Sequence, residues 1–293
     1  MIYNYGSLNV DYVYRMQRFV QPGETLTCDK LSVFAGGKGL NQSVALAYAG
    51  ADVVHCGFVS RQAMFLVDTL ENAGVDTSLV QLTDNENGHA IIQVLPNGEN
   101  CIIVYPGTNY MQTDAFVEQV AQKLSVEDLI LFQNECGNAA NMMKKAKVKG
   151  ARIVLNPSPM NTTCLSLPLE LVDIFLLNEV EGREITHKKA VQEIVEDMHL
   201  KYPTAEIVLT LGKQGMIYCG SQEQFHVPAT NVGPVVDTTA AGDTFTGYFL
   251  ALKERGATAR EAALVASRAA GIAVTRKGAS ISIPRLDEVV SGI

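Results

Sequence analysis

The sequence lacks the features that mark three large classes of protein. Its six cysteines include no C-x-x-C pair, and no histidine lies at zinc-finger spacing from them. No segment approaches about eighteen consecutive apolar residues, the length that a membrane-spanning helix requires. Positive charge is outnumbered, because 23 lysines and arginines face 31 aspartates and glutamates and leave a net charge of -8. We therefore expect no zinc finger, no membrane span and no nucleic-acid partner, and an anionic ligand would need a local site.

The remaining composition is that of a compact protein of a reducing compartment. The cysteines are scattered and read as free thiols in the core or on the surface. The first residues, Met1 to Gly6, lack the basic region and the long apolar run of a signal peptide, so we expect a cytoplasmic location. With 47% hydrophobic and 18% charged residues, the chain has the composition of a globular protein.

Short apolar runs that end in polar residues or glycine alternate with amphipathic segments along most of the chain. This pattern predicts a mostly parallel sheet covered by helices. The expected strands are 53–59, 129–132, 153–155, 174–177 and 207–211. The expected helices are 39–49, 116–124, 139–148 and 191–198, the last with an apolar stripe at Val191, Ile194, Val195 and Met198.

Two segments, about 10–34 and 89–105, follow a different pattern. They alternate polar and apolar residues, and the second one turns at Pro96-Asn97-Gly98, which is a hairpin signal. They predict a small antiparallel subdomain that projects from the large one. Such a flap would act as a lid that excludes water from the reaction. A plain appendage or a dimerisation surface are the alternatives, and the same strands can serve as lid and dimer surface.

The most informative stretch runs from Val236 to Phe245, with the sequence VDTTAAGDTF. From Phe245 onward apolar residues recur at helical spacing, which predicts a helix that begins near Ala241. Small residues at its start leave the first backbone N–H groups accessible, and such a helix start binds anions. Asp243 would lie beside the anion, where a carboxylate suits an enzyme that deprotonates an alcohol next to a phosphate. An ordinary acidic residue in a first helical turn explains this stretch, taken alone, equally well.

A second polar set lies near the N-terminus. The segment 6–11, GSLNVD, is expected to end a first strand at the N-terminus, and Asn9 and Asp11, two residues apart, therefore share a face. The segment 36–41, GGKGLN, opens the next helix and places Lys38 and Asn41 on one side. Amides, a carboxylate and a cation together suit a polyhydroxylated ligand, whose hydroxyls both donate and accept. The segment is not a Walker A loop, and alone it fits a glycine-rich turn before a helix better than a site.

Together these motifs resemble the ribokinase-like (PfkB) family of sugar kinases, and within it the ribokinases, over essentially the full length. The matching segments are 6–11, 22–25, 36–42, 156–159, 178–181, 210–215, 237–245 and 273–279. The resemblance implies one domain over 1–293 with a three-layer αβα ribokinase-like fold, a mostly parallel central sheet and a small β lid. It also implies that ATP phosphorylates the primary hydroxyl of a small sugar, foremost D-ribose, and that the lid joins two copies in a homodimer.

The resemblance also assigns roles to residues. Asp243 would be the base that takes the proton from the sugar hydroxyl. The N–H groups of Ala241, Gly242 and Asp243 would stabilise charge on the transferred phosphoryl. The residues that would hold the sugar are Asn9, Asp11, Gly37, Lys38, Asn41, Glu135 and Asp243.

For the nucleotide, the resemblance implies Asn178, Thr210, Gly212, Gly215, Gly242 and Ser267. Glu181, together with Asn178, would steady through water a Mg²⁺ that rides on the phosphates. A monovalent cation, K⁺, would lie beside the anion site and order its loop. The matching positions, which act mainly through backbone carbonyls, are Asp237, Thr239, Ala273, Arg276, Gly278 and Ser282.

Two departures from the family pattern bear on what the resemblance implies. The family has Gly-x-Asp-x-x-Gly where this chain has 60–65, SRQAMF, and Ser267 stands where a larger residue often flanks the adenine. The alternatives to ribose are another furanose, a keto-sugar or a nucleoside. A nucleoside would need an apolar or aromatic platform for its base, which nothing near Asn9 to Asn41 plainly supplies. A sugar-binding protein without turnover is a further alternative, although it would not need Asp243 inside an anion site.

Overall fold

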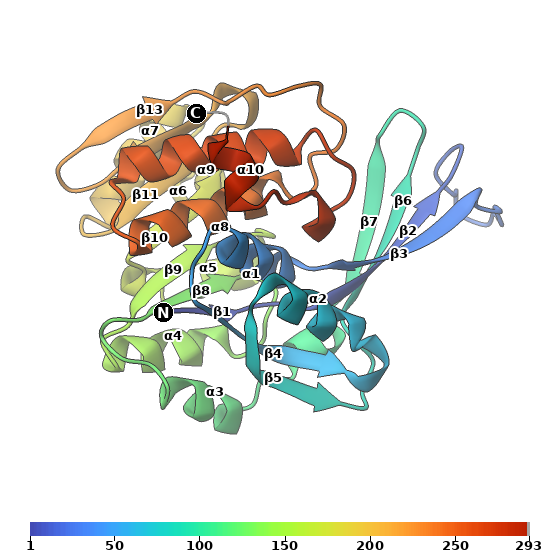
Figure 1. The fold of residues 1–293 in the computed structure, drawn as a ribbon, viewed down its shortest axis with the longest axis horizontal. Helices are drawn as coiled ribbons and strands as arrows, with labels where there is room; N and C mark the ends of the chain where they lie inside the picture. The colour runs from blue at the N-terminus through green and yellow to red at the C-terminus, as the bar shows by residue number, and fades with distance from the viewer. Residues whose placement is uncertain (292–293) are drawn as a thin grey trace.

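The computed structural model describes residues 1–291, and a nine-stranded sheet of order β13-β12-β11-β10-β9-β8-β1-β4-β5 forms its centre (Figure 1). The strands from β11 to β5 run parallel, and β12 and β13 add an antiparallel hairpin at one edge. Parallel neighbours require crossover connections, which place helices on both faces. The strands are β1 (Ile2–Tyr5), β4 (Val53–Ser60), β5 (Asp76–Thr83), β8 (Leu129–Gln133), β9 (Arg152–Asn156), β10 (Ile174–Asn178), β11 (Glu206–Thr210), β12 (Met216–Cys219) and β13 (Gln224–Val227).

The helices form an outer layer on each face of this sheet. Helices α1, α2, α8, α9 and α10 pack over one hydrophobic core, and α3, α4, α6 and α7 pack over the other. Because side chains alternate along a strand, Leu129 and Leu131 of β8 enter the first core while Ile130 and Phe132 enter the second. The helices are α1 (Lys38–Tyr48), α2 (Phe65–Ala73), α3 (Asp114–Ala121), α4 (Ala139–Val148), α5 (Thr162–Leu165), α6 (Glu179–Thr186), α7 (Val191–Lys201), α8 (Ala241–Glu254), α9 (Ala259–Ala273) and α10 (Leu286–Val290).

The three-layer αβα architecture confirms the fold that the sequence predicts. The expected strands of the large sheet and the expected helices are present with ends that differ by a few residues, and α8 begins at Ala241. In α7 the predicted stripe faces the second core, where Ile194, Val195 and Met198 are buried. The atypical 60–65 segment forms a short 3-10 turn, Arg61–Ala63, in which the Ser60 side chain accepts a hydrogen bond from Gln62 N.

Four strands form the second sheet, which projects from the main body in Figure 1. Their order is β3-β2-β6-β7, with β2 (Asn9–Arg15), β3 (Lys30–Gly36), β6 (His89–Val94) and β7 (Asn100–Tyr105). The expectation of a wholly antiparallel flap is wrong for the central pair, because β2 and β6 run parallel. Both strands continue from parallel strands of the large sheet, β1 and β5, and so leave it in the same direction. We call this sheet the lid.

None of the helices within residues 1–291 combines the length and the apolar character that crossing a membrane requires.

Candidate active site

Polar residues end four neighbouring parallel strands and meet at one edge of the sheet. Gln133 of β8 pairs in register with Asn156 of β9, and Asn178 of β10 pairs with Thr210 of β11. These are carboxyl ends of the strands, where open parallel sheets place their ligands. The edge therefore carries hydrogen-bonding side chains above a sheet whose other strand residues are largely apolar.

The first turn of α8 lies at this edge with open backbone donors. Within residues 1–291, the N–H groups of Gly242 and Asp243 have no hydrogen-bond partner, whereas Ala241 N donates to Thr238 O at 3.2 Å. A Cβ added at Gly242 would meet no atom within 4 Å, so the space before these donors is open. Unpaired N–H groups at the positive end of a helix dipole form an anion site.

Asp243 lies one residue after this opening and is held by two amide groups. Asn41 Nδ2 donates to its Oδ2 at 3.0 Å, and Gln42 Nε2 donates to its Oδ1 at 2.8 Å. Its side chain is only 8% exposed, yet it lines a cavity. The carboxylate is thus fixed on both oxygens while one side remains accessible to a ligand.

That cavity has a volume of about 540 Å³ and lies between the sheet edge, α1 and the lid. The structure brings together there every residue expected to hold the sugar: Asn9, Asp11, Gly37, Lys38, Asn41, Glu135 and Asp243. Ala90 and Ile92 of β6 and Ile102 and Val104 of β7 line it from the lid side. We call it the polar cavity.

Asn9 and Asp11 enter the polar cavity because glycines make room beside them. A Cβ at Gly36 would overlap the Asp11 carboxylate, and Gly37 adopts a φ of 92°, which favours glycine. Asn109 Nδ2 donates to Asn9 Oδ1 at 2.6 Å. This bond leaves the amide nitrogen of Asn9 as its donor toward a ligand.

The charges of the polar cavity depend on one another. Burial, with the nearby charges of Glu135 and Asp243, raises the pKa of Asp11 to about 7. Burial also raises the pKa of Glu135, although Lys38 and the hydroxyl of Ser7 oppose that shift. For Lys38, burial lowers the pKa, but Asp243 and Glu135 outweigh it and keep the pKa above its usual value. The cavity therefore holds a charged lysine among carboxylates, of which Asp11 exchanges its proton near neutral pH.

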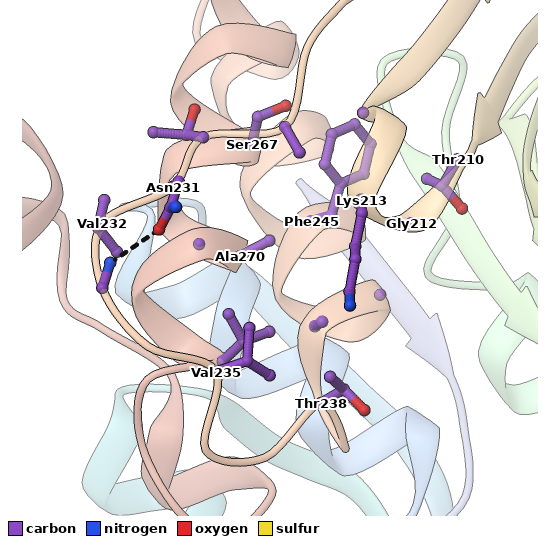
Figure 2. Close-up of a pocket in the computed structure, with 18 of the residues that line it drawn as sticks. Thr210, Gly212, Lys213, Asn231, Val232, Val235, Thr238, Phe245, Ser267 and Ala270 are labelled. Carbon is purple, nitrogen blue, oxygen red and sulfur yellow. Dashed lines mark hydrogen bonds between the residues drawn. The ribbon is translucent and has the colours of Figure 1, made fainter.

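A second cavity of about 650 Å³ lies on the other side of the α8 N-terminus (Figure 2). Its walls combine apolar side chains, such as Val235, Phe245 and Ala270, with backbone of glycine-rich loops. Figure 2 shows Lys213 extending across it toward the side where Thr238 lies. The expected nucleotide residues that line it are Thr210, Gly212, Gly215, Gly242 and Ser267. We call it the apolar cavity.

The two cavities meet at three residues, Thr210, Thr238 and Gly242, that line both. Ala241 lines the apolar cavity, whereas Asp243 lines the polar one. The anion site of α8 therefore lies at the boundary, where a phosphoryl group could face a ligand on each side.

Asn178 and Glu181 lie in the lining of the polar cavity, beside this boundary. They form a capping box at the start of α6: the Asn178 side chain accepts from Val180 N and Glu181 N, and Asn178 N donates to Glu181 Oε2 at 2.8 Å. The side chain of Glu181 is only 3% exposed. Burial raises the pKa of Glu181, against the hydrogen bonds from Asn178 and Ser158. Glu181 is therefore a buried member of this helix start, whereas Asn178 is exposed.

Of the six positions expected at a monovalent cation, Asp237 and Thr239 lie in the loop before α8, and the other four run from Ala273, the last residue of α9, to Ser282 in the 3-10 turn Ser280–Ser282. The Asp237 carboxylate accepts hydrogen bonds from Thr239 N and Gly278 N, each at 3.0 Å, and so joins the loop before α8 to the loop after α9. Ala273 O accepts from Arg276 N, whose guanidinium pairs with Glu288, and Ser282 Oγ donates to Ala279 O. Residues 1–291 contain no cluster of three His, Cys, Asp or Glu side chains suited to a metal. Backbone carbonyls are thus the main oxygen ligands that these loops offer.

Ser7, Asn109 and Gln42 contact expected site residues but have no role among the expectations from sequence. Ser7 Oγ donates to Glu135 Oε2, Asn109 orients Asn9, and Gln42 contacts Asp243. Ser7 and Gln42 lie inside the matched motifs at 6–11 and 36–42, which is the signal that could have found them. Asn109 follows the lid in a segment without any recognisable pattern.

Comparison with known proteins agrees with this geometry. The model of the pfkB family of carbohydrate kinases matches residues 1–286. The chain is 32% identical over 296 residues to a ribokinase of Staphylococcus aureus (strain COL). The alignment covers 97% of this chain and 96% of that relative. Among solved structures, ribokinase of Cryptococcus neoformans in complex with ADP superposes with a TM-score of 0.86 at 29% identity, covering 100% and 99% of the two chains. Ribokinase of Arabidopsis thaliana, complexed with ribose and ATP, gives a TM-score of 0.86 at 26% identity, covering 99% and 97%.

Proposed function

The chain belongs to the pfkB family of carbohydrate kinases, and from this premise we propose that it transfers the γ-phosphoryl group of ATP to the 5-hydroxyl of D-ribose. One observation carries the proposal: a polar and an apolar cavity meet at the open N-terminus of α8, beside Asp243. Relatives named ribokinase, and a solved relative that holds ribose and ATP, support ribose as the sugar.

The sugar would occupy the polar cavity, with Asp243 next to its primary hydroxyl. Asn9 offers an N–H donor, Lys38 a charged donor, and Asp11 and Glu135 carboxylate acceptors, so neighbouring hydroxyls find partners of both kinds. The lid would cover the bound sugar and exclude water, which would otherwise compete for the phosphoryl group.

In the reaction, the sugar oxygen forms a bond to the γ-phosphorus while the bond from that phosphorus to the bridging oxygen of ADP breaks. The hydroxyl proton passes to the Asp243 carboxylate. We assign the stabilisation of phosphoryl charge to the unpaired N–H groups of Gly242 and Asp243. The N–H of Ala241 would contribute only after leaving Thr238 O.

The nucleotide would lie in the apolar cavity, with its phosphates toward Gly242. We propose that Mg²⁺ accompanies these phosphates and that Glu181 faces it through water, since the carboxylate lines the cavity beside Thr210 and Gly242. Mg²⁺ keeps several water ligands and neutralises phosphate charge when it is bound. Thr210, Gly212, Gly215 and Ser267 would form the walls of the nucleotide site, and Asn178 would orient Glu181.

We propose that K⁺ binds between the loops that Asp237 joins. Both oxygens of this carboxylate already accept hydrogen bonds from backbone N–H groups. Backbone carbonyls of the same loops that accept no hydrogen bond would therefore complete the coordination shell of the ion. The bound charge would order the segment 237–240, which precedes the anion site.

We propose that two copies of the chain associate through their lids. The strand β7 is an edge strand that is exposed along its whole length, with Ile103 at 60% and Tyr105 at 46% exposure. A long apolar edge is an unstable surface in a monomer and pairs readily with another strand.

We also propose a cytoplasmic location, because the six cysteines are unpaired and a reducing compartment keeps thiols free.

The test is a panel of free sugars and nucleosides with the purified protein, ATP, Mg²⁺ and K⁺. We expect the highest kcat/KM with D-ribose, and transfer only to its 5-hydroxyl. Nucleosides should be poorer substrates, because among residues 1–291 no aromatic side chain lines the polar cavity and only aliphatic side chains of the lid, Ile92, Ile102 and Val104, could contact a base. Higher kcat/KM for a nucleoside or a hexose would overturn the assignment of ribose.

A further inference from the structure

Gln42 contacts the base from outside the polar cavity. It follows Asn41 in α1, is fully buried, and is absent from the described residues that line the cavity. Its Nε2 donates to Asp243 Oδ1 at 2.8 Å, opposite the bond from Asn41 to Oδ2. Gln42 therefore touches the carboxylate without access to the sugar.

The direction of the Gln42 amide is fixed first by Asn156. Asn156 Nδ2 donates to Leu176 O at 2.8 Å, and a backbone carbonyl can only accept. The amide oxygen of Asn156 must therefore face Gln42, whose Nε2 donates to it at 3.0 Å. If the Gln42 amide were inverted, its Oε1 would face the amide oxygen of Asn156 and also Oδ1 of Asp243, and both contacts would be repulsive.

A second chain of buried amides gives the same direction from the other side. Gln42 Oε1 accepts from Gln133 Nε2 at 2.7 Å, and Gln133 Nε2 also donates to Asn4 Oδ1 at 2.9 Å. Asn4 is oriented by the backbone, because its Nδ2 donates to Gly39 O at 2.8 Å. Gly39 O thus orients Asn4, Asn4 orients Gln133, and Gln133 turns the NH₂ group of Gln42 toward Asp243.

The chain continues to a buried histidine. Asn4 Nδ2 donates to Ser43 Oγ at 2.8 Å, and Ser43 Oγ lies 2.9 Å from His55 Nδ1. His55 Nε2 lies 3.2 Å from Gly6 O, which only accepts, so Nε2 carries the hydrogen and Nδ1 accepts from the Ser43 hydroxyl. Burial lowers the pKa of His55 to about 4, which keeps the ring neutral near pH 7. Three backbone carbonyls, of Gly6, Gly39 and Leu176, therefore fix the donor and acceptor direction of every hydrogen bond in this network of side chains.

We propose that Gln42 is a positioning residue for phosphoryl transfer, and that the amides of Asn4, Gln133 and Asn156 fix its NH₂ group on Asp243. The inference rests on the proposed role of Asp243 as the base. With one donor on each oxygen, the carboxylate cannot rotate about its bond to Cβ without losing a hydrogen bond. A base held in this way keeps the alignment that proton transfer requires.

Three isosteric replacements of glutamine by glutamate test this inference. Gln42→Glu replaces the donor by an oxygen that faces Asp243, and we expect kcat to fall by about 100-fold with the sugar KM changed less than about threefold. Gln133→Glu places an oxygen against Gln42 Oε1 and removes the hydrogen bond that orients the Gln42 amide from this side, so the NH₂ group is held less firmly on Asp243 and kcat should fall by about tenfold. Gln112 is the matched control, because it is buried and its Nε2 has no partner within residues 1–291. Gln112→Glu keeps the acceptor for Gly137 N and should leave kcat within about twofold.

Circular dichroism and thermal melting establish that the variants fold, and calorimetry with D-ribose gives their sugar affinity. A wild-type kcat in Gln42→Glu, or an equal loss of kcat in Gln112→Glu, would overturn the inference. If Gln42→Glu does not fold, Gln133→Glu decides: a reduced kcat at unchanged sugar affinity supports the inference, and an unchanged kcat contradicts it. If the wild-type protein phosphorylates no sugar, the proposed function fails separately. A crystal structure of Gln42→Glu then decides the inference by whether the Asp243 carboxylate has turned.

Discussion

The two cavities that meet at α8 differ in how their walls can contact a ligand. In the polar cavity, side chains with fixed hydrogen-bond partners face the ligand, and Asn9, Glu135 and Asp243 are each held by another residue. In the apolar cavity, most of the wall is aliphatic side chain and glycine-rich backbone. A sugar is identified by the direction of each hydroxyl, which calls for fixed partners, whereas an adenine ring can be held by shape and apolar contact. We therefore expect substrate discrimination to depend on the polar cavity far more than on the apolar one.

The largest effect is expected at Asp243, which lines the polar cavity beside its boundary with the apolar one. Asp243→Asn keeps the shape of the side chain and removes the proposed base, so kcat should fall by about three orders of magnitude. The new NH₂ group must face either Asn41 Nδ2 or Gln42 Nε2, so the variant should also melt at a slightly lower temperature. Calorimetry should find the affinities for ribose and ATP nearly intact. Turnover close to that of the wild type would exclude Asp243 as the base.

A pair of variants separates the two cavities. Asp11→Ala removes the proposed, half-buried partner of a sugar hydroxyl and should cost about 1–3 kcal/mol in ribose binding, without changing the KM for ATP. Ala270→Leu adds volume to the wall of the apolar cavity, which Ala270 lines, and should raise the KM for ATP by about tenfold while ribose affinity stays constant. Steady-state kinetics with each substrate varied in turn measures both. Crossed effects, with Asp11→Ala acting on ATP alone, would show that the ligands have been assigned to the wrong cavities.

A smaller effect is expected from the monovalent cation, which would act on the wall that both cavities share. At equal ionic strength and saturating Mg²⁺-ATP, K⁺ should stimulate kcat several-fold over Na⁺, because a smaller ion fits a carbonyl cage of fixed size less well. Asp237→Ala frees Thr239 N and Gly278 N and should reduce this stimulation. Equal rates in the two salts would mean that the loop before α8 is ordered without the cation.

The sequence predicts the parts of this site that depend on local periodicity. The start of α8 at Ala241, the position of Asp243 in its first turn and the shared face of Asn9 and Asp11 all follow from residues within a few positions of each other. The parallel pairing of β2 with β6 does not follow from neighbouring residues. It depends on the direction in which β1 and β5, the strands before them, run in the large sheet.

The contacts of Gln42 could not be predicted for the same reason. Gln42 meets Asp243 across 201 residues and Gln133 across 91 residues. No local pattern states that the end of β8, the start of α1 and the start of α8 are neighbours in space. The motif match brings Gln42 to notice, but its role needs the direction of each amide, which only the fold supplies.

The smallest effect concerns stability and distinguishes Asp11 from carboxylates outside the polar cavity. Burial raises the pKa of Asp11 to about 7, so between about pH 4 and pH 7 the folded protein without sugar retains a proton that the unfolded chain has released. The free energy of unfolding should therefore fall as the pH rises through this range, by at most about 1.4 kcal/mol per pH unit from this group. Asp11→Asn should remove the contribution of Asp11 to the pH dependence of the free energy of unfolding. The contributions of Glu135 and Glu181, whose pKa values are also raised, should remain. Asp52→Asn is the control, because Asp52 is exposed, its side chain has no hydrogen-bond or salt-bridge partner within residues 1–291, and its replacement should leave the slope unchanged. Urea unfolding at four or five pH values would measure the difference, and parallel curves for the wild type and Asp11→Asn would mean that Asp11 is ionised in the empty cavity throughout.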